Sequence, residues 1–231
     1  MGAHQASRPK VYEKDCGFRI YKIYKKSPLK LLGINELTDF IIPPDELNLY
    51  KISFEDWLKD YKNQKIKIKI YSLLTRKMKE IEIELKDIDN KDEILGCEIN
   101  YENYISAQEK LLHVIKVKKN SFAEENLFLI ENQDYIIGLK NLSNGVYNIL
   151  NNKRFKELIN VFSEIISRNK GKECEFYIYN IKKGPKIIMA KIPDKRNFTL
   201  GCDVAFGKIH EFPMKSKKGE DEDEEKSSLK G

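Results

Sequence analysis

Residues 95–99 of this chain read LGCEI, and residues 200–204 read LGCDV. Each segment places an apolar residue, a glycine and a cysteine before an acidic residue, and each leads into a short run typical of a β-strand. Two such similar segments about 100 residues apart indicate a duplicated domain, since solenoid repeats have shorter periods. We therefore expect the same folding unit to occur twice.

The residues before each segment also repeat, in the same order. An alternating strand comes first, followed by a short apolar turn, a short buried strand, a helix and a hairpin. In the first pass these elements are residues 17–24, the turn from Ser27-Pro28 to Gly33, residues 39–42, a helix from Ser53, and residues 66–71 with 81–85. In the second pass they are residues 111–117, the turn after Asn120-Ser121, residues 134–137, a helix over 155–166, and residues 176–179 with 187–190, which turn at Gly184-Pro185.

Each predicted helix has an apolar face. In the first helix Ser53 can cap the free amides, with Asp56 in the reciprocal position. The apolar face of this helix consists of Phe54, Trp57, Leu58 and Tyr61. That of the second helix, spaced i, i+3, i+4 and i+7, consists of Phe155, Leu158, Ile159, Phe162, Ile165 and Ile166. We expect both faces to be buried, and each strictly alternating hairpin to expose one face to water.

The composition fits two small soluble domains. The chain has 231 residues, of which 41% are hydrophobic and 34% are charged, and this length permits two domains of about 100 residues. No stretch approaches the ~20 uncharged apolar residues that span a membrane, and the N-terminus lacks a signal-peptide core. We expect a cytosolic chain whose four cysteines, which form no CxxC pair, are free thiols: Cys16, Cys97, Cys174 and Cys202.

The net charge of +6 is unevenly distributed. Residues 214–231 read MKSKKGEDEDEEKSSLKG, and such charge blocks cannot form a core. The basic remainder favours a solvated surface, because its lysines alternate with isoleucine and acidic residues. Attraction to an anionic membrane is the second interpretation, and binding to nucleic acid, which needs a dense basic stripe with exposed aromatics, is the third. We expect no nucleic acid partner.

The repeated unit resembles a PDZ domain whose strand order is permuted, and two such units in tandem resemble the Golgi reassembly stacking protein (GRASP) family. The segments that carry this resemblance are GFRI at 17–20, Ser27-Pro28, IYS at 70–72, ILGC at 94–97, HV at 113–114, DYIIG at 134–138, LGC at 200–202 and FGKIHEFP at 206–213. The last of these is the most specific, since it is similar to the family's Gly-Tyr-Gly-Tyr-Leu-His-Arg-Ile-Pro.

The resemblance implies an α+β fold of two tandem PDZ-like domains. Each would be a small β-barrel or sandwich with permuted strand order and one main helix. The predicted division is a flexible arm over 1–15 that can carry a lipid, domains over 16–108 and 109–213, and a disordered charged tail over 214–231.

The resemblance also implies that each module binds a peptide as an added strand between its last strand and its helix. The candidate residues of the first groove are Trp57, Leu58, Leu95, Gly96, Cys97 and Ile99, and those of the second are Leu200, Gly201, Cys202 and Val204. A glycine in each loop lets backbone amides converge on an anion. The other interpretation is that Trp57, Leu58 and Ile99 are core residues.

We predict that residues 206–213 are a ligand as well as a domain end. Three of these residues are apolar, namely Phe206, Ile209 and Phe212, and Pro213 stops further strand pairing. The resemblance implies that this segment enters the first-module groove of a neighbouring copy. The alternative is that it packs against its own second module. Insertion into a neighbour would be head-to-tail, so copies could link into arrays.

Departures from the family pattern limit what the resemblance implies. Animal members have a His in the first strand and a Cys after the first-module groove strand, which help to bind a metal shared with a golgin partner. Arg19 and Glu102 stand at these places, and because Arg is not a metal ligand we expect no metal or other cofactor. The family's Ser/Pro-rich tail is replaced by the short acidic stretch.

Gly2 follows Met1 and can accept myristate, although Ala6 stands where the usual pattern has Ser or Thr. A single myristate gives only marginal binding, so a second membrane contact would be needed. We expect attachment to the membrane surface through this lipid.

The function implied is a membrane tether or scaffold on the cytoplasmic face of the Golgi, which self-associates through a PDZ-type groove and binds golgin-like or cargo C-terminal peptides. The alternative is a membrane adaptor that captures partner C-termini without self-association. We expect no enzyme, because the three histidines, His4, His113 and His210, have no Ser, Cys or carboxylate at a catalytic spacing.

Overall fold

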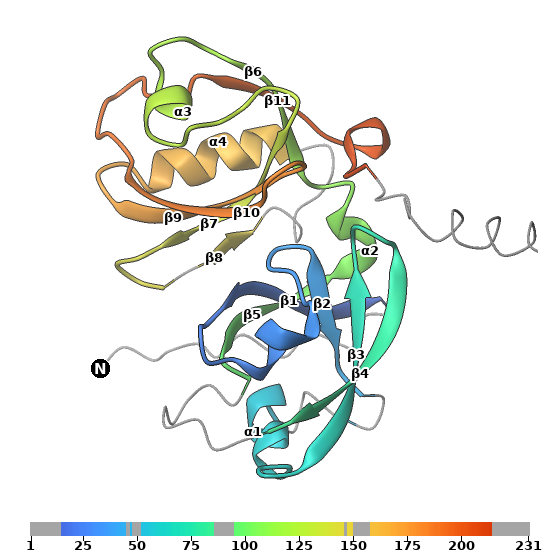
Figure 1. Cartoon of the computed structure of the whole chain (residues 1–231). Coiled ribbons are helices and arrows are strands. Elements are labelled where there is room, and N and C mark those ends of the chain that lie inside the picture. Colours follow the sequence, from blue (N-terminus) through green and yellow to red (C-terminus); the bar gives the residue numbers. More distant parts are fainter. Residues whose placement is uncertain are drawn as a thin grey trace, which may run out of the picture.

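The computed structural model describes residues 15–44, 47, 52–85, 95–145, 147–149 and 158–213. Gly2, Phe155, the charged tail and all but the last residue of the N-terminal arm lie outside the described residues. The described chain forms two antiparallel sheets, one above the other in Figure 1, each with its own short helices.

The first sheet has the strand order β4-β3-β2-β1-β5. Its strands are β1 (Cys16–Ile23), β2 (Asp39–Ile42), β3 (Lys65–Ser72), β4 (Lys77–Glu84) and β5 (Cys97–Asn103). Three short helices accompany it, namely η1 (Pro28–Leu32), α1 (Phe54–Lys59) and α2 (Tyr104–Ala107). We call this sheet with η1 and α1 the first module.

The second sheet repeats this order as β10-β9-β7-β6-β11, with β8 paired to β7 beside the main path. Its strands are β6 (Leu112–Val117), β7 (Asp134–Asn141), β8 (Tyr147–Ile149), β9 (Glu173–Asn180), β10 (Gly184–Lys191) and β11 (Cys202–Ala205). Its helices are α3 (Phe122–Glu125), α4 (Leu158–Arg168) and the short η3 (Lys208–His210). We call this sheet with α3 and α4 the second module. In both modules the last strand lies at the sheet edge next to the first strand, which is the permuted PDZ order.

Serine side chains start three of the short helices, of which the sequence predicted only the cap at Ser53. Ser53 accepts a hydrogen bond from the Asp56 N–H at 3.0 Å, at the N-terminus of α1. Ser27 begins η1 and Ser121 begins α3, so the two passes use the same residue type at the same point. Each cap satisfies an amide that has no partner inside its helix.

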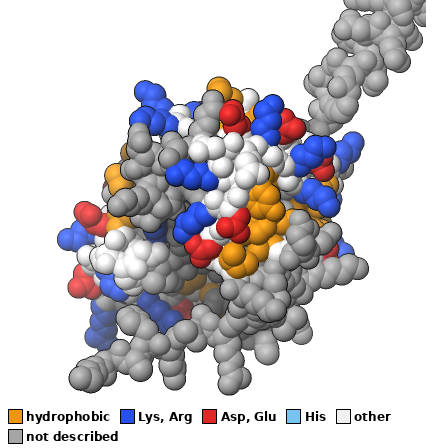
Figure 2. All heavy atoms as spheres, turned by 90° about the horizontal axis from the view of Figure 1, so that it is seen from below, with side chains coloured by type: hydrophobic (Ala, Val, Ile, Leu, Met, Phe, Trp, Pro, Cys, Tyr) orange, Lys and Arg blue, Asp and Glu red, His pale blue; other side chains and the backbone are white. Residues whose placement is uncertain are grey.

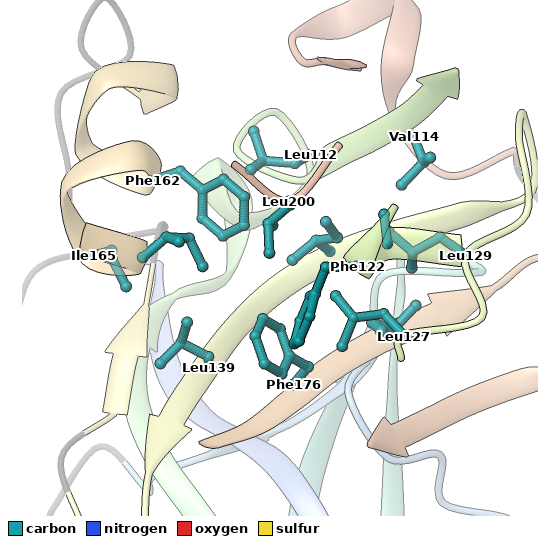
Figure 3. Close-up of a cluster of buried hydrophobic side chains, with 14 of the residues drawn as sticks. Leu112, Val114, Phe122, Leu127, Leu129, Leu139, Phe162, Ile165, Phe176 and Leu200 are labelled. Atoms are coloured by element: carbon teal, nitrogen blue, oxygen red, sulfur yellow. The ribbon is translucent and has the colours of Figure 1, made fainter. Parts of the chain in front are cut away.

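Each module encloses its own core. In the first module the core lies between the sheet and α1 and includes Ile20, Ile41, Phe54, Leu58 and Ile70. In the second module it lies between the sheet, α3 and α4, where Phe162, Leu112, Phe122, Phe176 and Leu200 converge (Figure 3). The amphipathic faces predicted for the two helices therefore point into separate cores.

A third apolar cluster joins the two modules, and we call it the interface core. Its buried members are Tyr21, Leu37, Phe40, Leu73, Leu74, Ala107, Leu111, Tyr135, Ile137, Tyr177, Tyr179 and Phe212. They come from β1, β2 with the turn before it, and the β3–β4 turn on one side, and from β7, β9 and the C-terminal exit on the other. Ala107 of α2 and Leu111, just before β6, lie on the connection between the modules. The rings of Tyr21 and Tyr177 meet edge to face across it, with centroids 4.8 Å apart.

The interface core corrects the expectation that each hairpin has one wet face. β3 does alternate between exposed and buried residues, but seven of the eight residues of β9 are buried. Phe176 and Ile178 face the second-module core, whereas Tyr177 and Tyr179 face the interface core. In the middle of β9, residues 176–179 are apolar or aromatic on both faces, as is common in a strand enclosed on both sides, so the sequence carries no sign of a wet face or of which face a second core covers.

The hairpin turn of the second module also differs from its prediction. Gly184 and Pro185 are the first residues of β10, paired with Asn180 and Tyr179, and the turn lies at residues 181–183. Asn180 holds this turn because its side-chain oxygen accepts the N–H groups of Lys182 and Lys183, at 3.0 and 2.9 Å. Pro185 is accommodated because β10 is an edge strand.

Candidate peptide-binding groove

The second module has an open groove of about 930 Å³ between β11 and α4. Its lining comes from α4, from β11 and the end of β6, and from the loop before β11. Its lining includes Ile159, Phe162, Ile166, Phe198, Leu200 and Val204. All four residues predicted for the second groove, Leu200, Gly201, Cys202 and Val204, line it.

β11 supplies an edge to which a peptide backbone can pair. It lies at the end of the sheet order and pairs with β6 in the register Cys202↔Val117 to Ala205↔His113. Peptide-binding domains of the PDZ kind add the ligand as a further strand at such an edge and choose its side chains through apolar pockets. The strand and the groove beside it provide both features.

The helix wall shows a residue whose burial was mispredicted. Ile159 was expected on the buried face of α4, yet 45% of its side chain is exposed, while Phe162 and Ile166 are buried. Ile159 lies over the groove rather than over the core. The periodicity placed it near the apolar face but could not separate a core position from a groove position. The second-helix wall was absent from the predicted site, although its place in the repeat matches that of Trp57 and Leu58.

The loop before β11 has a fixed conformation. Gly201 has φ +78°, and a Cβ built on it would lie 2.3 Å from the Cβ of Ser121, so only glycine fits. The Gly201 carbonyl accepts the Lys118 N–H at 2.8 Å, and the Leu200 carbonyl accepts the Ala123 N–H at 2.8 Å. These bonds hold the end of the groove against β6 and α3.

The groove is lined by apolar side chains and by charged ones, of which more are basic than acidic. Lys116, Lys118 and Lys119 line it from the end of β6, against the carboxylates of Glu131 and Asp203. Burial and, to a lesser degree, the nearby Asp203 carboxylate raise the pKa of the Cys202 thiol to about 11. Cys202 is therefore a neutral, weakly polar part of the groove at physiological pH.

In the first module, most predicted groove residues belong to the core. Leu58, Leu95 and Cys97 are buried, which supports the core interpretation for Leu58. Trp57 and Ile99 are partly buried and pack against this core. Gly96 has φ +61° and lies against Ser27, as Gly201 lies against Ser121.

Two partly buried aromatic residues, Trp57 on α1 and Tyr61 just after it, extend from the buried ring of Phe54 toward the surface of the first module. Trp57 stacks on Phe54 with ring centroids 5.8 Å apart, and contacts Tyr61 at 4.8 Å. Figure 2, which views the molecule from the side of α1 and the β3–β4 hairpin, shows a strip of hydrophobic side chains among charged ones. β5 is an edge strand on this module, as β11 is on the other.

The structure separates the three residues predicted to act as an internal ligand. Phe212 is only 2% exposed and packs between the rings of Tyr135 and Tyr179, each 4.8 Å away. Phe206 packs against the second-module core. Ile209, on η3, is 89% exposed. Phe212 and Phe206 therefore do not project as ligand side chains. Phe212 is buried in the interface core of its own chain, and Phe206 packs against the second-module core.

Arg19 and Glu102 form a buried ion pair, with Arg19 Nη1 and Glu102 Oε2 3.6 Å apart. The Tyr21 hydroxyl donates to Glu102 at 2.5 Å, and burial raises the pKa of Tyr21 well above its ordinary value. The Arg19 guanidinium also lies 4.9 Å from the centroid of the Phe40 ring. The pair thus joins side chains of the neighbouring strands β1 and β5 in a buried structural contact beside Phe40 of β2.

These features define a class of protein. Two antiparallel sheets with the same permuted order, each with an edge strand entered through a glycine loop and a helix beside it, are PDZ-like modules in tandem. In the described part of the chain, no helix has both the length and the apolar character of a membrane span.

Comparison with known proteins gives the particular family. The family model described as "GRASP55/65 PDZ-like domain" matches residues 68–215, and the chain belongs to this family. The mouse protein Golgi reassembly-stacking protein 1 is 23% identical over 202 residues, which cover 85% of this chain and 42% of the relative. The chain therefore spans less than half the length of this curated relative.

Proposed function

We propose that this chain is a Golgi-associated scaffold that joins copies of itself by placing Ile209 of one copy in the groove between α4 and β11 of the next. The observation that carries this proposal is the open apolar groove in a protein that also presents an exposed isoleucine at a fixed turn. The family and the name of the mouse relative support the Golgi as the place of action. In this proposal the chain acts by binding and not by catalysis.

Of the three apolar residues predicted as a ligand, only Ile209 is exposed enough to contact another copy. Phe206 and Phe212 anchor the exit segment to its own chain, and the η3 turn between them holds Ile209 out. The groove of a second copy offers Ile159, which is half-exposed, as an apolar contact. Such a contact would remove both side chains from water, which favours association.

This contact is head-to-tail, because the ligand and the groove are different surfaces of one chain. Such contacts generate open chains of copies unless the geometry closes a ring. Copies held on two facing membranes could then link them. Attachment through Gly2, which lies outside the described residues, stays a prediction, as do the cytoplasmic face and golgin-like or cargo peptides as further partners.

Self-association of the full chain tests the proposal, by sedimentation and by clustering of coated beads. We expect Ile209→Asp and Ile159→Asp each to abolish clustering, since a buried unpaired carboxylate is far costlier than one lost apolar contact. Leu31→Asp is the matched control, because Leu31 is also an exposed apolar residue, 93% accessible, on the distant η1. The control should cluster like the parent.

A mixture of the two variants tests the head-to-tail geometry. Ile209→Asp keeps an intact groove and Ile159→Asp keeps an intact ligand, so the mixture should form pairs but not larger clusters. Clustering of both single variants at the parental level would contradict the proposal. Loss of clustering in Trp57→Asp, with Ile159→Asp unaffected, would move the contact to the first module.

The adaptor function is a second candidate, favoured by the three lysines at the loop end of the groove. A C-terminal carboxylate placed near them would gain favourable electrostatic interactions. If this is the function, the parent stays monomeric and binds apolar C-terminal peptides. Ile159→Asp should then lose the peptide while Ile209→Asp retains it.

A further inference from the structure

Two histidines that lie far apart in the sequence meet at the edge of the second module. His113 is on β6 and His210 ends η3, and their Nδ1 atoms are 3.2 Å apart. Neither residue belongs to the groove. Both side chains are partly exposed, so small solutes can reach them.

Each ring is held in place from its own side. His113 lies flat on the ring of Tyr135, with centroids 4.5 Å apart and the planes only 5° from parallel. His210 is fixed through η3, where its N–H donates to the Gly207 carbonyl at 2.8 Å. Gly207, with φ +97°, makes the turn that brings His210 back to β6. The two histidine rings are therefore brought together by contacts that the fold makes to each of them.

The distance between the two nitrogens suits one metal ion. Imidazole nitrogens bind Zn²⁺ at about 2.0–2.1 Å, which places two ligands of a tetrahedral ion about 3.3 Å apart. Imidazole ligands suit zinc, copper and nickel among the first-row metals. A hydrogen bond between the two Nδ1 atoms needs a proton on one of them. When both Nδ1 atoms bind an ion, that proton would move to Nε2 of the same ring or leave to water, so that both rings ligate as neutral imidazoles.

We propose that His113 and His210 form a binding site for one Zn²⁺ ion, which both Nδ1 atoms ligate; this would revise the sequence-based expectation of no metal, which rested on Arg19 and Glu102 in the other module. Among the described residues, no group of three or more His, Cys, Asp or Glu side chains could hold a metal. The ion would therefore have two ligands from the described chain and complete its coordination with water. Two ligands bind more weakly than the three or four of catalytic and structural zinc sites, so occupancy would follow the available zinc.

The site would link β6 to the C-terminal exit. Phe212 of the interface core lies two residues beyond His210, and the Tyr135 hydroxyl donates to the Glu211 carbonyl at 3.3 Å. An ion on the two histidines would hold η3 against β6 and thereby keep this segment in place. Zinc should then raise the thermal stability of the protein, because it binds the folded form.

Zinc titration of the full chain, stripped of metal, tests the proposal. The parent should bind one Zn²⁺ per chain by equilibrium dialysis and metal analysis, and should melt at a higher temperature with zinc. His210→Gln should weaken binding by more than the ~10-fold that loss of an outer-shell partner costs, and should remove the melting shift. His4→Gln is the matched control, since it deletes the third histidine, and it should behave like the parent.

Cobalt distinguishes the histidine pair from adventitious binding by cysteine. Co²⁺ bound to the parent should give visible d–d bands without the intense thiolate charge-transfer band. His113→Asn, which keeps a polar side chain beside Tyr135, gives a second variant and should lose these bands. Equal zinc affinity in the parent and His210→Gln, a thiolate band, or no binding by the folded parent would each overturn the proposal.

Discussion

Gly96 and Gly201 hold the same place in the two modules, and each is tied to the serine that starts the module's first turn. The Ser27 hydroxyl donates to the Leu95 carbonyl at 2.6 Å, and the Ser121 hydroxyl donates to the Gly201 carbonyl at 3.2 Å. The glycine is needed for its left-handed backbone and for its missing Cβ. The repeat of Leu-Gly-Cys in the sequence therefore reflects a repeated contact.

Gly201→Ala separates these two requirements when it is compared with Gly184→Ala. Both glycines have positive φ, but a Cβ on Gly184 meets no atom within 4 Å. We expect Gly184→Ala to lose about 1 kcal/mol from backbone strain alone. Gly201→Ala should lose about 1–3 kcal/mol more, because its Cβ overlaps Ser121. Urea unfolding measures both, and equal losses would contradict the steric contribution.

Asp39 and Asp134 show why part of the fold could be predicted from single residues. Asp39 accepts the Asn35 N–H and Asp134 accepts the Ile130 N–H, both at 2.9 Å and both four residues earlier. Each carboxylate closes the turn before the module's second strand. Local contacts of this kind leave a visible pattern, because the residues involved are close in sequence.

At the scale of elements, the sequence predicts both main helices and the strands of both sheets in their order, except β8, and it predicts only the first half of β7. β2 was predicted with its observed bounds, Asp39–Ile42. The features that the sequence could not predict are those set by contacts between elements that are far apart in the chain. β9 alternates between two kinds of apolar residue, and nothing local distinguishes a wet face from one covered by the interface core. The exposure of Ile159 likewise depends on how far α4 stands from β11.

The exit segment has two kinds of apolar residue, and substitution should separate them. Phe212→Ala removes a ring buried among Tyr135 and Tyr179 and should cost about 3–5 kcal/mol of stability. Ile209→Ala changes an exposed side chain and should stay within about 0.5 kcal/mol of the parent. Thermal and urea unfolding of the two variants compare them. A larger loss for Ile209→Ala would mean that η3 is packed differently.

At the scale of the whole molecule, the two modules are joined by side-chain contacts as well as by the connecting chain. Besides the interface core, three ion pairs between described residues cross from one module to the other, namely Lys22–Glu175 at 3.8 Å, Lys140–Glu98 at 2.6 Å and Arg76–Glu211 at 2.5 Å. Partly exposed ion pairs contribute little each, so the buried aromatic residues supply most of the coupling. A rigid pair of modules would hold the groove and Ile209 at a fixed relative position in each copy, which regular linkage of copies requires.

The interface core should make the two modules unfold as one unit. Trp57, the single tryptophan, reports on the first module, and the buried thiol of Cys174 reports on the second. We expect tryptophan fluorescence and the alkylation of Cys174, followed by mass spectrometry, to give the same midpoint in urea.

Two neighbouring residues of β9 provide a matched test of this coupling. Tyr177 faces the interface core and Ile178 faces the second-module core, and both are fully buried. Ile178→Ala should cost about 2–5 kcal/mol and lower both midpoints together, because the modules remain coupled. Tyr177→Ala removes the ring that packs on Tyr21, so it should separate the two transitions. Separate midpoints in the parent, or coincident midpoints in Tyr177→Ala beside split ones in Ile178→Ala, would mean that the interface core does not couple the modules.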